Sequence, residues 1–206
     1  MPVISSDIHG SDIVYGDLKI HLPLVGEHQI FNVGLVLCTA EALRKSGLNI
    51  SDEALKAGIE SVKMPARFEL LNENPLFVLD GAHNPGGLKA LSGAIDKYLN
   101  SKNIICVMGM LKDKDCKSSL RFLEGKLYKL ITTTVKDNPR RQTAEELKET
   151  ASVYFEDITA EENPLKAVDT ALQLAEETDN SAVLVCGSLY LASDIRFYLE
   201  RIGFLK

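Results

Sequence analysis

The chain has 206 residues and a formal net charge of −6 at pH 7. This length is enough for one large domain, or for one domain with part of another, around a buried core. The acidic balance gives no basic footprint for nucleic acid, and the apolar segments are far shorter than a membrane span. The first ten residues lack the basic-then-apolar pattern of a secretory signal, so we expect a cytoplasmic protein.

The four cysteines are widely spaced and form no CxxC pair, at Cys38, Cys106, Cys116 and Cys186. We interpret them as small buried hydrophobic residues of a protein in a reducing compartment. Neither these cysteines nor the four histidines show the spacing of metal ligands, so we predict no zinc site and no metal-binding residue in this chain.

Residues 1–66 predict a hairpin arm followed by two helices. Residues 12–24 alternate in hydropathy and end near Pro23, as a strand or hairpin arm does. Residues 28–47 carry apolar side chains at helical spacing and end at Gly47, and Ser51 is placed to cap a second helix. Such a segment makes a poor domain by itself, so we expect it to be the end of something larger.

From Arg67 onward, strand-like and helix-like runs alternate. The strand-like runs are 68–71, 76–80, 103–109, 128–135 and 182–187, and the helix-like runs are 86–100, 114–125, 143–152, 164–177 and 189–201. Thr143 and Glu146 have the spacing of a capping box. This alternation predicts an α/β fold, a Rossmann-like and mainly parallel sheet with helices on both faces.

Polar residues follow four of the predicted strands, at the point where each strand ends. They are Asp80 with His83, the segments 112–115 and 136–141, and Gly187 with Ser188. The carboxyl ends of parallel strands share one edge of a sheet, where ligands bind in open α/β folds. Each charged loop taken alone is better explained as a solvated surface. Together they favour a site for a small anionic ligand.

The sequence LDGAHNPGG, residues 79–87, is the densest of these segments. Asn84 and Pro85 suit the first positions of a helix, as its N-cap and first residue. A helix start lined by glycines just after a strand can also bind an anion. The start of a helix does not require Asp80 or His83. The segment alone therefore leaves a turn and a ligand site equally open.

Five segments together resemble one family: GEHQIFN at 26–32, MPARFE at 64–69, LDGAHNP at 79–85, DKD at 113–115 and GSLY at 187–190. Their order and spacing are similar to those in the C-terminal part of folylpolyglutamate synthase, often bifunctional with dihydrofolate synthase, in the Mur ligase superfamily. The resemblance implies that residues 1–64 end a central ATPase domain and that residues 65–206 form the Mur-type C-terminal domain.

The resemblance implies an ATP-dependent ligase that adds L-glutamate to folate or dihydropteroate through an acyl phosphate. Its implied partners are ATP, Mg²⁺ and the N-terminal ATPase domain, which would hold most of the metal site. No G-x-x-x-x-G-K-[S/T] phosphate-binding loop occurs in the chain. We therefore expect this chain to be the C-terminal part of a longer, monomeric enzyme and to be inactive alone.

The resemblance also implies roles for six residues. Asn32, Arg67 and Asp80 would lie near ATP, and His83, Lys114 and Ser188 would hold glutamate or the transferred phosphate; Asp80 and His83 would be catalytic. Five of them have a structural alternative: Asn32 on a helix surface, Arg67 in an ion pair, Asp80 and Ser188 as caps, and Lys114 in solvent.

Two other functions remain open. One is a related ligase that adds a different amino acid in peptidoglycan-precursor synthesis, although the DGAHNP loop favours the folate branch. The other is a binding module that kept the fold and lost the chemistry, since fold does not fix function.

Overall fold

The computed structural model describes residues 2–205, and the chain divides into two compact units between Pro65 and Ala66. Each unit has a hydrophobic core of its own. Among the described residues, no helix combines the length and the apolar character needed to cross a bilayer.

The first unit combines a small antiparallel sheet with two helices. Its strands are β1 (Val3–Asp7), β2 (Gly10–Tyr15) and β3 (Leu18–Leu22), paired in that order, and its helices are α1 (Glu27–Lys45) and α2 (Asp52–Glu60). The predicted hairpin arm is confirmed as β2 and β3, and both helices are confirmed. Strand β1 was not predicted, because its five residues show no clear alternation and only partial burial.

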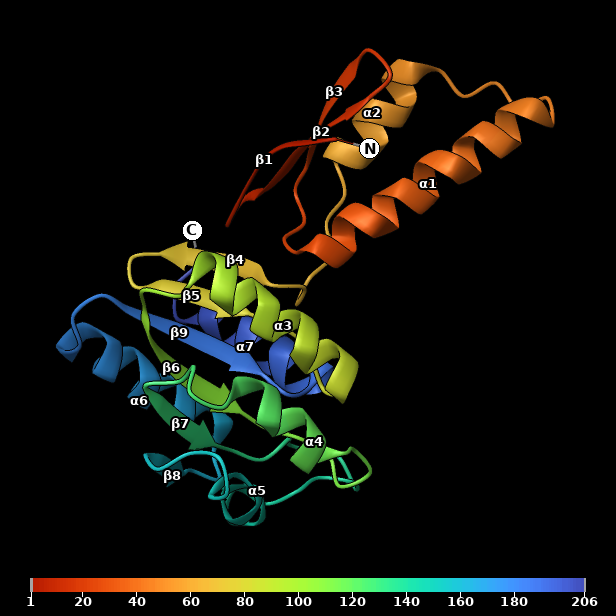
Figure 1. Ribbon diagram of the computed structural model, residues 1–206. Coiled ribbons are helices and arrows are strands. Elements are labelled where there is room, and N and C mark those ends of the chain that lie inside the picture. The colour runs from red at the N-terminus through yellow and green to blue at the C-terminus, as the bar shows by residue number, and fades with distance from the viewer. Residues whose placement is uncertain (1, 206) are drawn as a thin grey trace. The chain divides into compact units, whose positions relative to one another are not determined.

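The second unit is built on a mainly parallel sheet (Figure 1). Within the described residues it has six strands in the order β4-β5-β9-β6-β7-β8, with only β4 antiparallel to its neighbour. The bounds are β4 (Glu69–Glu73), β5 (Leu76–Leu79), β6 (Asn103–Met108), β7 (Lys129–Thr132), β8 (Ile158–Ala160) and β9 (Ser181–Cys186). The predicted α/β class is therefore confirmed.

Helices cover both faces of this sheet. Figure 1 shows α3 and α4 in front of the sheet and α6 and α7 behind it. Their bounds are α3 (Pro85–Tyr98), α4 (Cys116–Leu120), a 3₁₀ turn η1 (Arg121–Leu123), α5 (Ala144–Ala151), α6 (Pro164–Glu177) and α7 (Leu189–Arg201). The helix predicted over 114–125 was too long, because regular α-helix ends at Leu120 and a 3₁₀ turn follows.

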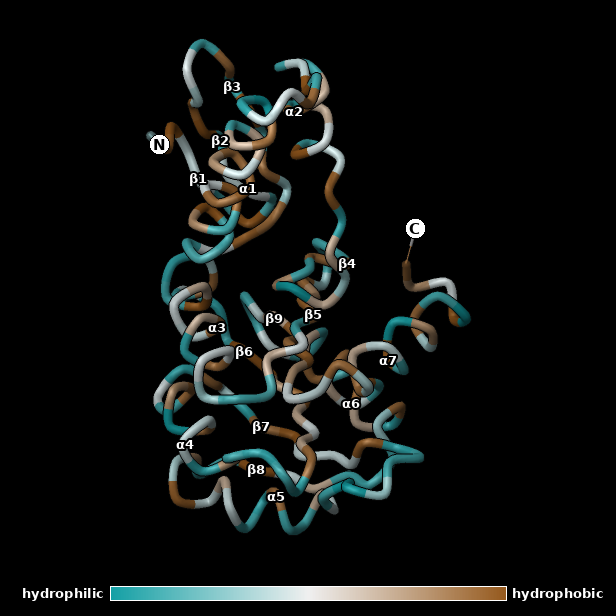
Figure 2. Tube along the Cα trace, turned by 90° about the vertical axis from the view of Figure 1, so that its right-hand side faces the viewer, coloured by the Kyte–Doolittle hydropathy of each residue, from teal (hydrophilic) through white to brown (hydrophobic). Residues whose placement is uncertain are grey.

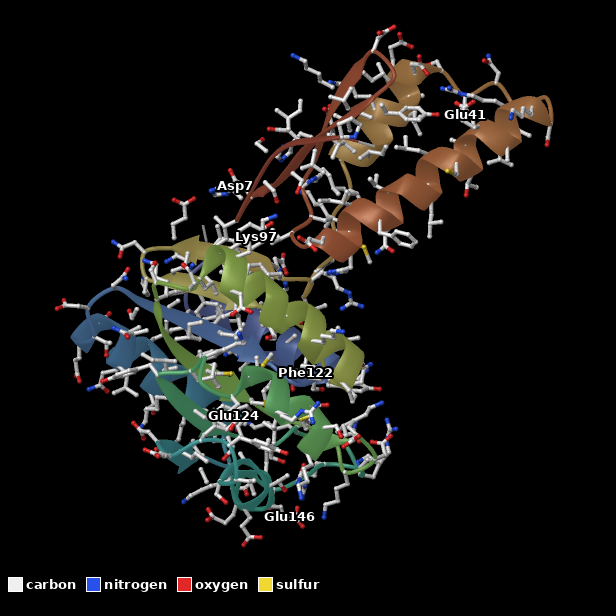
Figure 3. All side chains as sticks on the ribbon, viewed as in Figure 1. Asp7, Glu41, Lys97, Phe122, Glu124 and Glu146 are labelled. Carbon is white, nitrogen blue, oxygen red and sulfur yellow. The ribbon has the colours of Figure 1, made fainter. Side chains whose placement is uncertain are left out.

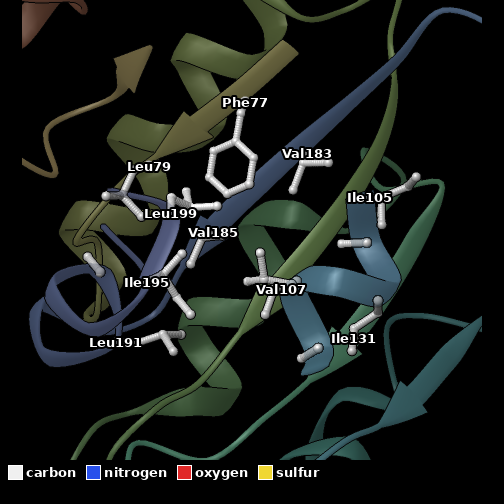
Figure 4. Packing of buried hydrophobic residues seen from close by; sticks show 14 of the residues in the cluster. Phe77, Leu79, Ile105, Val107, Ile131, Val183, Val185, Leu191, Ile195 and Leu199 are labelled. Atoms are coloured by element: carbon white, nitrogen blue, oxygen red, sulfur yellow. The ribbon is translucent and has the colours of Figure 1, made fainter. Parts of the chain in front are cut away.

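The larger core lies between the sheet and the helices α6 and α7 (Figure 4). Alternate residues of each strand point to one face of a sheet, and Val183 and Val185 meet the helices in this way. Helix α7 contributes Leu191, Ile195 and Leu199 to the same core, and these residues are spaced about one helical turn apart. In Figure 2, β6 and β7 carry apolar segments, as expected of strands covered on both faces.

Local sequence sets the helix starts. Asn84 caps α3 by accepting the Gly87 amide at 2.8 Å, with Pro85 as the first helical residue. The capping box of α5 is confirmed: Thr143 and Glu146 accept each other's backbone amides. Figure 3 labels Glu146.

Two expectations need correction. Strand β8 was missed because its three residues form a short edge between polar segments. Cys38 is exposed on α1, so only Cys106, Cys116 and Cys186 fit the interpretation of buried cysteines.

Gly187 allows the chain to leave β9 against a neighbouring backbone. Its φ of +101° lies in the region that favours glycine. A Cβ atom added there would lie 2.6 Å from the carbonyl oxygen of Gly109, which follows β6. The strand ends therefore approach each other more closely than a side chain permits.

We expect the substitution Gly187→Ala to destabilise the fold by about 1–3 kcal/mol, because it adds both backbone strain and a clash. Urea unfolding followed by circular dichroism measures the change. The control is Gly93→Ala in α3, where the added Cβ meets nothing within 4 Å. This variant should gain about 0.5–1 kcal/mol from helix propensity. A Gly187→Ala variant as stable as the wild type would contradict this account.

Candidate functional site

The carboxyl ends of the parallel strands are joined into one edge by backbone hydrogen bonds. The Asp80 amide donates to Val185 O at 2.9 Å, and the Gly187 amide donates to Ala82 O at 2.8 Å. On the other side of β9, the Gly109 amide donates to Cys186 O at 3.3 Å. The residues that follow β5, β6 and β9 therefore form one continuous rim.

Asp80 is the buried carboxylate of this rim, with 9% of the residue exposed. Its Oδ1 accepts the Ala82 amide and its Oδ2 accepts the Phe68 amide, both at 2.7 Å. The first bond closes an Asx turn at the end of β5. The second ties this turn to the segment that leads into β4. Charge-assisted hydrogen bonds of this kind are short and strong, so Asp80 organises the backbone around it.

His83 follows three residues later and is half-buried. Its Nδ1 lies 2.8 Å from the carbonyl oxygen of Gly81. A carbonyl can only accept, so Nδ1 carries a proton. In the neutral ring, Nε2 then presents a lone pair that can accept a proton or a hydrogen bond.

Arg67 lies between two residues with left-handed backbone, Ala66 at φ +55° and Phe68 at φ +45°. Its Nη1 donates to the carbonyl of Ala66 at 3.1 Å. Among the described residues, Arg67 forms no ion pair with a carboxylate, and its side chain is half-buried. The turn therefore presents a permanent cation that no acidic neighbour neutralises.

Ser188 is buried, with 3% exposed, and caps the last helix. Its Oγ accepts the amides of Tyr190 and Leu191 at 3.1 and 3.5 Å. The structural alternative for this residue is therefore observed, and its contact with glutamate stays a prediction.

Lys114 lies in the loop after β6, next to two ion pairs that brace that loop. Lys112 contacts Glu146 at 3.0 Å and Arg140 contacts Asp113 at 2.8 Å. Lys114 itself is half-buried and joins no ion pair within residues 2–205. It belongs to the same edge of the sheet as Asp80 and Ser188, since β5, β9 and β6 run parallel.

A buried thiol pair lies directly beneath this rim. Cys186 ends β9, and its sulfur lies 3.7 Å from that of Cys106 on β6. The hydrogen bond with Cys106, then burial and the nearby charge of Asp80, hold the pKa of Cys186 well above its usual range. Cys186 is therefore a protonated thiol at neutral pH and is unsuited to act as a nucleophile.

Asn32 is exposed on α1 of the first unit. Its Nδ2 donates to the side-chain oxygen of Gln29 at 3.1 Å, and the Gln29 amide nitrogen lies 3.0 Å from His28 Nε2. This short polar row runs along the first turns of the helix. Its part in nucleotide binding stays a prediction.

No group of three or more His, Cys, Asp or Glu residues within residues 2–205 is arranged to hold a metal ion. Both oxygens of the rim's buried carboxylate, Asp80, accept backbone amides. The rim as it stands is suited to anionic groups through Arg67 and Lys114, and to an ammonium group through the Nε2 lone pair of His83.

Comparison with known families gives one decisive match. The model of the Mur ligase family, glutamate ligase domain, matches residues 66–189. The chain belongs to the Mur ligase family. The matched segment of this Mur ligase chain lies wholly within the second unit and contains Arg67, Asp80, His83, Lys114 and Ser188.

Individual relatives and solved structures show which members of the Mur ligase family this chain resembles. The Mur ligase chain is 33% identical over 183 residues to the dihydrofolate synthase/folylpolyglutamate synthase of Bacillus subtilis strain 168, covering 88% of the chain and 41% of the relative. For the Mycobacterium tuberculosis protein of the same name, the identity is 32% over 209 residues, covering 94% and 42%. The chain thus spans under half the length of these relatives.

Among structures, Mycobacterium tuberculosis folylpolyglutamate synthase complexed with ADP and AMPPCP matches with a TM-score of 0.84 at 29% identity, over 95% of this chain and 47% of that one. A bifunctional folylpolyglutamate synthase/dihydrofolate synthase with Mn, AMPPNP and L-glutamate bound matches with a TM-score of 0.70 at 27% identity, over 93% and 45%.

Sequence reasoning missed the pair that braces the Arg67 turn from the other side. Glu69 forms an ion pair with Arg196 of α7, and its second oxygen accepts the Ala66 amide at 2.9 Å. Glu69 stands in the quoted MPARFE segment, so the segment itself gave a signal. Arg196 gave none, because it is one of several charges on an amphipathic helix.

We expect Asp80→Asn to destabilise the fold by about 1–3 kcal/mol, because an amide NH₂ would face one of the two backbone donors and leave it unsatisfied. Urea unfolding of the purified chain measures the effect. The matched control is Asp96→Asn, which weakens the ion pair between the exposed Asp96 of α3 and Lys126 and should cost at most about 1 kcal/mol. Equal effects of the two substitutions would contradict the structural role of Asp80.

Proposed function

We propose that this chain is the C-terminal part of an ATP-dependent ligase that adds L-glutamate to folate, with dihydropteroate as a second candidate acceptor. The observation that carries the proposal is the rim of a glutamate ligase domain on which Arg67, Asp80 and His83 are held together. The names of the relatives support the choice of glutamate and folate.

The reaction needs two transfers. The γ-phosphoryl group of ATP passes to a carboxylate of the folate, giving an acyl phosphate and ADP. The amine of glutamate then attacks the acyl carbon, a C–N bond forms, and the C–O bond to phosphate breaks. Positioning and charge neutralisation supply most of the rate of phosphoryl transfer.

The rim offers groups for both steps. Arg67 supplies a fixed positive charge for the nucleotide phosphates. Asn32 of the first unit is proposed as a further nucleotide contact. Asp80 keeps the Arg67 turn and the His83 loop together through its two backbone contacts. Lys114 and Ser188 would hold carboxylate or phosphate oxygens through a charge and a hydroxyl.

His83 is suited to the proton that glutamate must lose. The amine of glutamate is protonated in water and can attack only after it releases a proton. Nε2 of His83 carries the lone pair that could accept it, since Nδ1 is fixed on Gly81 O. A divalent metal, when bound, would neutralise phosphate charge, and we assign its ligands to the N-terminal half.

An N-terminal half is supported by the outer face of α1. Three large apolar residues of this helix are exposed by half or more: Phe31 at 70%, Leu35 at 55% and Val36 at 50%. The opposite face of α1 already packs into the core of the first unit through Val33 and Leu37. A helix that is apolar on both faces is typical of a buried position.

A groove next to this face has the same character. It has a volume of about 620 Å³ and is lined mainly by α1 and α2, mostly with apolar side chains. All of its lining residues belong to the first unit. We propose that the N-terminal ATPase half of the full-length protein covers the groove and the exposed face of α1.

The substitution Leu35→Gln tests whether the N-terminal half covers this face of α1. In the 206-residue chain, where Leu35 is exposed, the substitution should change stability by at most about 0.5 kcal/mol. In the full-length protein it should cost about 2 kcal/mol or more, because a buried apolar contact is lost. Urea unfolding of both proteins measures the two effects. Equal effects of Leu35→Gln in the two proteins would mean that this face of α1 stays uncovered. The control is Leu37→Ala, which should destabilise both proteins because Leu37 is already buried in the 206-residue chain.

A kinetic assay tests the activity. The full-length protein should release ADP in a reaction that requires glutamate together with dihydropteroate or a reduced folate, and the 206-residue chain should release none. His83→Ala should lower kcat by about 10²-fold or more without changing the melting temperature. His21→Ala, which changes an exposed residue of β3 in the first unit, serves as the control. ADP release that depends on another amino acid instead of glutamate would sink the assignment.

A further inference from the structure

We propose that Glu69 and Arg196 are positioning residues for Arg67, acting through the backbone turn that carries it. This inference rests on the proposed function, because it assigns Arg67 to the bound nucleotide. Glu69 and Arg196 come from β4 and α7, and their ion pair is only partly exposed, at 28% for each side chain.

The turn needs support because two of its residues adopt a conformation that L residues rarely take. Ala66 has φ +55° and Phe68 has φ +45°, and Phe68 is a bulky residue buried to 3%. Such residues persist only where the surroundings fix them. Arg67 stands between the two, so the direction of its side chain follows the geometry of the turn.

Hydrogen bonds from two sides fix that geometry. Glu69 Oε2 accepts the Ala66 amide at 2.9 Å, and Asp80 Oδ2 accepts the Phe68 amide at 2.7 Å. The Ala66 carbonyl in turn accepts the Gly81 amide at 2.9 Å and a guanidinium N–H of Arg67 at 3.1 Å. Both flanking amides of Arg67 are therefore bonded to carboxylates.

Arg196 orients the Glu69 carboxylate. Its Nη2 contacts Glu69 Oε1, and its Nη1 lies 3.8 Å from Glu200. Arg196 also neutralises Glu69, which stands only two residues from Arg67 in the sequence. A Glu69 carboxylate without Arg196 could pair with Arg67 and take its charge away from a bound phosphate. The ion pair thus keeps Glu69 on the backbone and leaves the Arg67 guanidinium available.

The test is a double-mutant cycle in the full-length enzyme, with KM for ATP, kcat and melting temperature measured for each form. We expect Glu69→Gln to raise KM for ATP about tenfold, as small misplacements of a positioned group do. Arg67→Ala should raise it at least as much. The double variant should be no worse than Arg67→Ala within about twofold, because Glu69 acts only through Arg67.

The control is Asp157→Asn, which removes a carboxylate from the Lys129–Asp157 ion pair. This pair lies at the start of β7, away from the carboxyl ends of the strands that form the rim. It should leave KM for ATP unchanged. Effects of Glu69→Gln and Arg67→Ala that multiply in the double variant would overturn the inference, as would an unchanged KM in Glu69→Gln.

A second measurement separates this inference from the proposed function. In the 206-residue chain, Glu69→Gln should speed hydrogen exchange at the Ala66 amide, which loses its charged acceptor. Unchanged exchange there overturns the positioning role. Faster exchange supports it, whereas a wild-type full-length enzyme without glutamate-dependent turnover overturns the proposed function and leaves the structural brace standing.

Discussion

The buried carboxylate of Asp80 is the interaction on which the rim depends. One oxygen holds the Ala82 amide of the loop that follows β5, and the other holds the Phe68 amide of the turn that precedes β4. A buried charge is costly unless it is fully hydrogen-bonded, and here backbone donors supply those bonds. Asp80 thereby joins two loops, one carrying Arg67 and the other carrying His83, that the sheet alone would not bring into a fixed relation.

The rest of the rim follows from close approach between strand ends. Gly187 lets β9 turn against Gly109, and the cap by Ser188 starts α7 at that point. Helix α7 then packs its apolar stripe on the sheet and places Arg196 beside Glu69. The same helix therefore contributes to the core and to the brace behind Arg67, so stability and site geometry are coupled in this domain.

Features that depend on residues close together in the sequence could be predicted from it. Continuous apolar runs gave the central strands, and the caps at Asn84 and Thr143 were predicted from neighbouring residues alone. The shared edge followed from the rule that parallel strands end together. Contacts between residues far apart in the sequence could not be predicted. Asp80 accepts the Phe68 amide, and Glu69 contacts Arg196 although most of the domain's sequence lies between them. Backbone amides carry no sequence signal, so the acceptor role of Asp80 became visible only in the fold.

The most direct measurement of the central claim is nuclear magnetic resonance on the isotope-labelled chain, through scalar couplings across hydrogen bonds. The account predicts couplings from the carboxyl carbon of Asp80 to the amide nitrogens of both Phe68 and Ala82, the two donors placed at 2.7 Å. Both amides should also exchange slowly with solvent. Absent couplings, together with exchange as fast as that of an exposed loop, would contradict the view that Asp80 builds this rim.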